Sequence, residues 1–137
     1  MVSKDTHLTK DYELSFEEID IGNQIIADFI GLKKKGNIYK FPRGSEGYTH
    51  LYFHSSFEWI LQALDHIERL GYDTVIVRLN TVNNVQYSCK IREELLPSDN
   101  VLAHVISDHK VTAIWRAVIT FCEQNQKLKV KSNLKTK

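Results

Sequence analysis

A chain of 137 residues with 42% hydrophobic content is long enough for one domain with a buried core, and shorter than chains that usually divide into two. It has no apolar run near the roughly 18 residues of a membrane-spanning helix, and its polar start differs from a secretory signal, so we expect a cytoplasmic protein without a membrane partner. The formal net charge of +1 excludes a domain that is basic over its whole surface.

The charge is concentrated at the two ends of the chain. Residues 1–20 contain six acids and two lysines, whereas residues 127–137 contain five lysines and no acid. Residues 1–13 lack apolar periodicity and residues 127–137 are too rich in lysine to pack well, so both are predicted to be flexible tails. We therefore expect a single ordered α+β domain over residues 14–126.

The first predicted element is a short N-terminal helix. Apolar residues between Ile21 and Ile30 recur at helical spacing, and Gly31 stands where a left-handed C-terminal cap would lie. The next segment, residues 31–54, contains four glycines and a proline, which predicts a long loop with one or two short strands.

A long helix is predicted over about residues 55–70, because Ser55 and Glu58 have the spacing of an N-terminal capping box. This helix has two apolar stripes, so it must cover two partners: the sheet on one side, and another helix, the loop or a second copy of the chain on the other. Trp59 is interpreted either as core under the loop or as part of a self-association face. That face would consist of Trp59, Ala63, His66 and Leu70.

Alternating apolar residues predict an antiparallel hairpin over about residues 72–91, joined by the turn-rich segment "NTVNN". Residues 101–106 fit either a third strand or an apolar loop, and a two-stranded hairpin alone is marginal. A C-terminal helix with one apolar face follows over about residues 108–126, with Ser107 or Asp108 as N-cap. The predicted fold is therefore a small antiparallel sheet covered by helices.

Histidines and cysteines offer few chemical sites. His50 and His54 lie in a predicted loop, where their spacing of four does not converge on a metal. His104, Asp108 and His109 could form an acid–base cluster, but no nucleophile or oxyanion-binding loop is recognisable beside them. Cys89 and Cys122 are interpreted as small buried hydrophobic residues. We predict no catalytic residue, metal or cofactor.

The loop before the long helix mixes cations with aromatic rings, which suits phosphates and stacked bases. The alternative is a solvated lysine turn whose aromatic residues cover the helix. The candidate binding residues are Lys33, Lys34, Lys35, Tyr39, Lys40, Phe41, Arg43, Tyr48, Tyr52 and His54.

Three segments follow the patterns G-N-x-x-I-A-x-F-M-G, H-S-S-W-x-W-L and A-V-x-x-F-I, with conservative departures at Ile30 and Phe57. The matching positions are Gly22, Asn23, Ile26, Ala27, Phe29 and Gly31, then His54, Ser55, Ser56, Trp59 and Ile60, and finally Ala117, Val118 and Phe121. In these segments the chain resembles a group of short proteins from Bacteroidetes genomes and their phages. The resemblance implies a shared fold over most of residues 21–126. It carries over no activity, because none is assigned to that group.

Three functions are compatible with this sequence. The first is a small non-enzymatic cytoplasmic protein, of phage or mobile-element origin, that acts by binding or as a homodimer. The second is a nucleic-acid or nucleotide binder that uses the loop of residues 33–54 and the basic C-terminal tail. The third is an enzyme with His54 or the cluster of His104, Asp108 and His109 at its centre.

Overall fold

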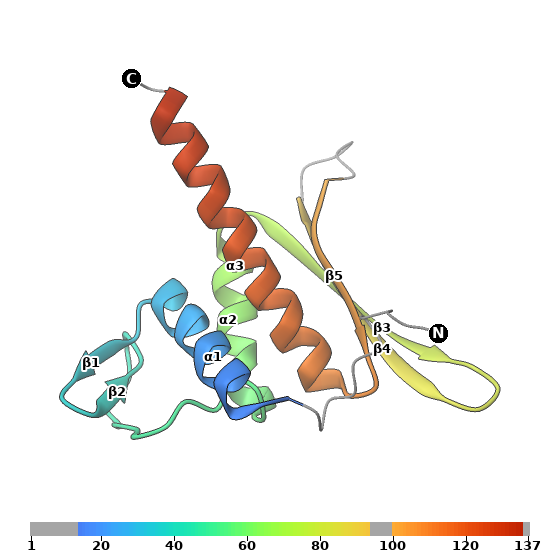
Figure 1. Cartoon of the computed structure of the whole chain (residues 1–137), viewed down its shortest axis with the longest axis horizontal. Coiled ribbons are helices and arrows are strands. Elements are labelled where there is room, and N and C mark those ends of the chain that lie inside the picture. Colours follow the sequence, from blue (N-terminus) through green and yellow to red (C-terminus); the bar gives the residue numbers. More distant parts are fainter. Residues whose placement is uncertain (1–13, 94–99, 136–137) are drawn as a thin grey trace.

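The computed structural model describes residues 14–93 and 100–135 (Figure 1). It confirms an α+β fold with two antiparallel sheets, one of two strands and one of three. The predicted tail of residues 1–13 lies outside the described residues. The elements in chain order are α1 (Phe16–Ile30), β1 (Lys33–Lys35), β2 (Ile38–Lys40), α2 (Phe57–Arg69), β3 (Tyr72–Asn80), β4 (Val85–Glu93), β5 (Val101–Ser107) and α3 (Lys110–Lys135).

The three helices lie on one face of the larger sheet, and the hairpin of β1 and β2 lies on the far side of the helices from that sheet (Figure 1). The larger sheet is a meander in the order β3-β4-β5. Helix α3 packs on β4 and β5, and α2 packs on β3. Helix α1 packs on α3 and α2, so the core lies between the sheet and a layer of helices.

Helix α1 begins before its apolar repeat, because a capping box starts it. The Ser15 hydroxyl accepts from the backbone N–H of Glu18, and the Glu18 carboxylate accepts from the backbone N–H of Ser15, each over 3.1 Å. The prediction started this helix too late, although the S-x-x-E signal is present in the sequence. Gly31 ends it in the left-handed conformation, with φ of 79°, as expected.

Gly22 allows α1 to approach α3 closely. A Cβ atom at this position would lie 2.4 Å from Cζ2 of Trp115 and 2.6 Å from Cδ1 of Ile119. Any larger residue would therefore force the two helices apart. Gly22, the first glycine of the G-N-x-x-I-A-x-F-M-G segment, therefore has a packing role.

The predicted capping box of α2 is wrong by one residue. The backbone N–H groups of Ser55 and Ser56 both donate to the carbonyl of Tyr52, so a turn precedes the helix and leaves Ser56 extended. The Ser56 hydroxyl then accepts from the backbone N–H of Trp59 at 3.2 Å, which makes Ser56 the N-cap.

The predicted hairpin is present, and β5 completes it as a third strand. Ile76 of β3 pairs with Cys89 of β4, which pairs with Val105 of β5. These residues share the face of the sheet that packs against the helices. The register between β4 and β5 shifts after Ile91, where Leu102 is an extra residue on β5.

Helix α3 differs from its prediction at both ends. It begins at Lys110, and the Ser107 hydroxyl accepts from the backbone N–H of His109, so neither Ser107 nor Asp108 is the residue before the helix. It continues to Lys135, into the predicted tail, because no glycine or proline interrupts it and lysine favours helix. The helix packs on the sheet and on both other helices, so a single apolar face was too narrow a prediction.

Candidate functional site

The lysine-rich part of the loop folds as a small hairpin. Strands β1 and β2 are antiparallel, with Lys33 opposite Lys40 and Lys34 opposite Tyr39. Gly36 makes the turn with a φ of 63°. Tyr39 also exchanges two backbone hydrogen bonds with Tyr48, of 2.7 and 2.9 Å, so a third extended segment supports the hairpin.

Five cations lie on this hairpin and just after it, and we call them together the basic hairpin: Lys33, Lys34, Lys35, Lys40 and Arg43. All five are exposed, and no ion pair joins any of them to a carboxylate within the part of the chain that the structure describes. Lys33 and Lys40 stand directly opposite each other, an arrangement in which like charges repel. A bound anion would relieve that repulsion.

Most of the loop's aromatic rings are not available for stacking on bases. The rings of Phe41, Tyr48 and Phe53 meet Trp59 edge to face, with centroids 4.9, 4.9 and 5.1 Å away. Tyr52 also contacts Trp59, at 5.3 Å, but its side chain remains 42% exposed. In this part of the loop the aromatic residues therefore cover the helix, as the alternative prediction has it.

Tyr39 has a local role in the hairpin. Its hydroxyl donates to the side-chain oxygen of Gln24 on α1 at 3.2 Å, which ties the hairpin to the helix. The Lys34 ammonium lies 5.2 Å from the centroid of its ring, a cation–π contact.

A pocket of about 360 Å³ lies at the base of the basic hairpin, between the loop and α2. The loop contributes Phe41 and Arg43, and α2 contributes His66 and Arg69. Arg69 is paired with Asp65 on the same helix, and the ring of His66 packs against Phe29 with centroids 4.8 Å apart. Arg43, in contrast, has no carboxylate partner among the described residues, so it adds an unpaired cation to this pocket.

The proposed self-association face lies largely inside a single chain. Trp59 and Ala63 are buried, and His66 is partly buried against α1. Leu70 alone of the four is exposed. The loop covers Trp59 and α1 covers His66, so of these four residues only Leu70 is left open to a second copy.

His54 belongs to a polar network that joins three segments. The amide nitrogen of buried Asn23 donates to His54 Nδ1 at 2.9 Å and to the carbonyl of Leu51 at 3.1 Å, and Trp115 Nε1 donates to the Asn23 oxygen at 2.9 Å. Burial lowers the pKa of His54, and nearby Asp20 partly opposes this. A neutral imidazole that accepts from Asn23 has a structural role.

The cluster predicted for an enzyme has other partners. His104 Nε2 lies 2.9 Å from the Ser88 hydroxyl, on the face of the sheet away from the helices. Asp108 accepts from the side chain of Gln86 at 3.4 Å. Among the described residues no three histidine, cysteine, aspartate or glutamate side chains are placed to hold a metal ion.

Both cysteines are buried and unpaired, on β4 and α3. Burial raises the pKa of each thiol to about 12, so neither is a thiolate near neutral pH. Their interpretation as small hydrophobic residues agrees with this placement.

Comparison with other proteins adds no functional assignment. No family model, curated protein or solved structure matches this chain. None of the helices that the structure describes has the length and apolar composition of a membrane span.

Proposed function

We propose that this is a non-enzymatic binding protein that holds a phosphate-bearing ligand, in the first place single-stranded nucleic acid, on the basic hairpin. The observation that carries the proposal is a set of five exposed cations on one small element, without carboxylate partners in the described residues. Cations arranged in this way attract the regularly spaced phosphates of a strand.

The placement of the aromatic rings supports a sequence-tolerant mode of binding. Phe41, Tyr48 and Phe53 are occupied around Trp59, so stacking is left chiefly to the exposed side of Tyr52. Affinity then comes mainly from charge, and little preference among bases is expected. Each phosphate contact to a single strand should contribute about −0.7 to the slope of log affinity against log salt concentration.

The test is fluorescence anisotropy of a labelled single-stranded DNA of about ten nucleotides, measured over a series of salt concentrations. The variant Lys33→Gln/Lys34→Gln/Lys35→Gln should weaken binding roughly tenfold or more and flatten the salt slope by about 2. A matched control, Lys90→Gln/Arg92→Gln/Lys110→Gln, removes three positive charges elsewhere and should retain nearly full affinity.

Two results would contradict the proposal. One is an absence of binding at low salt. The other is an equal loss of affinity in the hairpin variant and the control, which would show that net charge alone is responsible. Titration with a nucleoside triphosphate distinguishes a single strand from a free nucleotide as the ligand. If binding of the nucleotide depends on Arg43 and not on the three lysines, the site is the pocket beside α2.

A further inference from the structure

The two edges of the three-stranded sheet differ. Strand β5 carries the irregularity at Leu102. Strand β3 is nine regular residues, "YDTVIVRLN", without lysine, proline or bulge. Within the described residues it pairs only with β4. Natural edge strands usually carry a device that prevents pairing with another strand, and on β3 this is limited to the charged side chains of Asp73 and Arg78.

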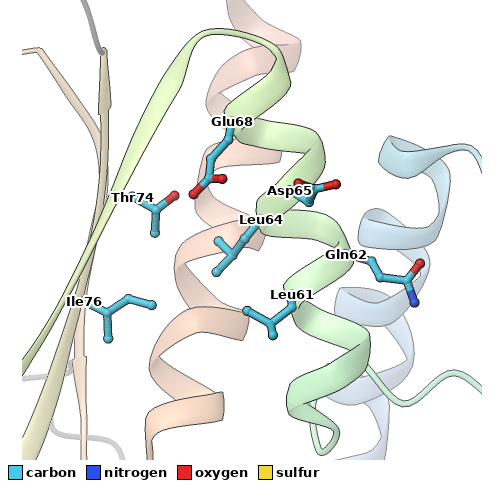
Figure 2. A pocket seen from close by; sticks show the side chains of 7 residues that line it. All are labelled: Leu61, Gln62, Leu64, Asp65, Glu68, Thr74 and Ile76. Carbon is cyan, nitrogen blue, oxygen red and sulfur yellow. The ribbon is translucent and has the colours of Figure 1, made fainter.

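A groove follows this edge, between β3 and α2 (Figure 2). Its volume is about 620 Å³. Leu61 and Leu64 point from α2 toward Ile76, as Figure 2 shows, and the Leu61 side chain is 41% exposed. On the opposite face of the same strand Val77 is 43% exposed. Apolar side chains are therefore exposed on both sides of this edge.

The polar groups of the groove are incompletely satisfied. The hydroxyl oxygen of Thr74 is buried and has no hydrogen-bond partner among residues 14–93 and 100–135. The Glu68 carboxylate reaches from α2 toward Thr74 (Figure 2), and Glu68 is exposed. A hydrogen-bond donor that entered the groove at this point would lie near both the Thr74 hydroxyl and the Glu68 carboxylate.

From these features we infer that β3 pairs with β3 of a second copy of this chain. The two strands run antiparallel about a two-fold axis at Ile76, so two three-stranded sheets become one of six strands. Closed two-fold dimers of this kind use the same surface on both subunits. The interface lies on the opposite side of α2 from the buried Trp59 stripe.

The central part of β3, residues 74–78, is self-complementary in this register. Val75 lies opposite the partner's Val77 on the outer face, where β-branched pairs stabilise neighbouring strands. Thr74 lies opposite the partner's Arg78 on the helix face. Arg78 is exposed in a single chain, and in the dimer its guanidinium would reach the Thr74 hydroxyl and the Glu68 carboxylate. A register shifted by one residue would place the helices of the two copies on opposite faces.

The inference is tested on the full chain by sedimentation velocity over a range of concentrations. The wild-type protein should sediment as a dimer of its 15.9 kDa chain. Arg78→Glu places like charges together and should raise the dimer dissociation constant at least about tenfold. The double variant Glu68→Arg/Arg78→Glu exchanges the two charges and should restore the dimer.

Arg43→Glu makes the same change of charge away from β3 and should leave the dimer intact. Circular dichroism of each variant shows whether the fold is retained. A wild-type protein that stays monomeric up to high concentration would overturn the inference, and so would a dimer that Arg78→Glu leaves unchanged. Either result leaves the proposed role of the basic hairpin untouched, because DNA binding is measured separately.

Discussion

At the scale of single residues, Asn23 explains the position of His54, which the sequence offered as a candidate binding residue. Its side chain connects His54, Trp115 and the Leu51 carbonyl by hydrogen bonds of 2.9 to 3.1 Å. A buried amide with its donors and acceptor satisfied fixes the relative positions of the segments that it joins. His54, which is partly buried, therefore has a structural role in this network.

Gly22 gives the sharpest prediction about a single side chain. Gly22→Ala should lower the free energy of unfolding by about 1–3 kcal/mol, because the new methyl group would overlap Trp115. Helix propensity alone predicts the opposite sign, a gain of about 1 kcal/mol. Urea unfolding measures the change. Gly44→Ala is the control, since its Cβ would make an ordinary 3.4 Å contact, and a Gly22→Ala protein as stable as that control would refute the close approach.

At the scale of elements, the caps are where expectation and structure differ most. The S-x-x-E spacing occurs at Ser15 and at Ser55, and only the first is a capping box. The backbone turn that follows Tyr52 decides which serine caps α2, and spacing alone does not reveal that turn.

Substituting the two adjacent serines separates the two assignments. Ser56→Ala should lower the free energy of unfolding by about 1 kcal/mol, because the backbone N–H of Trp59 loses its acceptor. Ser55→Ala should change it by no more than about 0.5 kcal/mol, since Ser55 is exposed. Thermal unfolding of both variants measures this. A larger loss of stability in Ser55→Ala than in Ser56→Ala would instead identify Ser55 as the N-cap.

The sheet and the helices could be predicted because their periodicity is local. Alternation in residues 72–91 and helical spacing after Val111 come from burial of one face, which the sequence records directly. Strand β5 stayed ambiguous, because a short apolar run fits a strand or a loop equally well. The roles of the aromatic loop residues depend on Trp59, which lies later in the chain, so the sequence left both stacking and packing open.

At the scale of the whole molecule, the His54 network makes stability depend on pH. The pKa of His54 is lowered in the folded state from its ordinary value of 6.5, so the unfolded chain takes up the proton first. The stabilising contribution of neutral His54 is complete above pH 6.5. It is lost as the pH falls from 6.5 through the lowered pKa that His54 has in the folded state. The free energy of unfolding should therefore decrease over this window.

Urea unfolding at a series of pH values checks this dependence. His54→Gln removes the titrating group, and its stability should change less than that of the wild-type protein as the pH falls below 6.5. The other histidines titrate in both proteins, so the difference between the two curves isolates His54. Parallel curves would show that His54 has the same pKa in the folded and unfolded states.

The hydrogen bond between Trp115 and Asn23 also determines when the fold can be completed. The two residues are separated by 92 positions, so α1 leaves the ribosome long before the helix on which it packs. At roughly 5–20 residues per second, α1 waits roughly 5–20 seconds for Trp115 to be synthesised. During that time Ile26 and Ile30 lack the α3 surface that helps to bury them in the finished protein. Helix α1 is thus synthesised before α3 but can complete its packing only after α3 has been made.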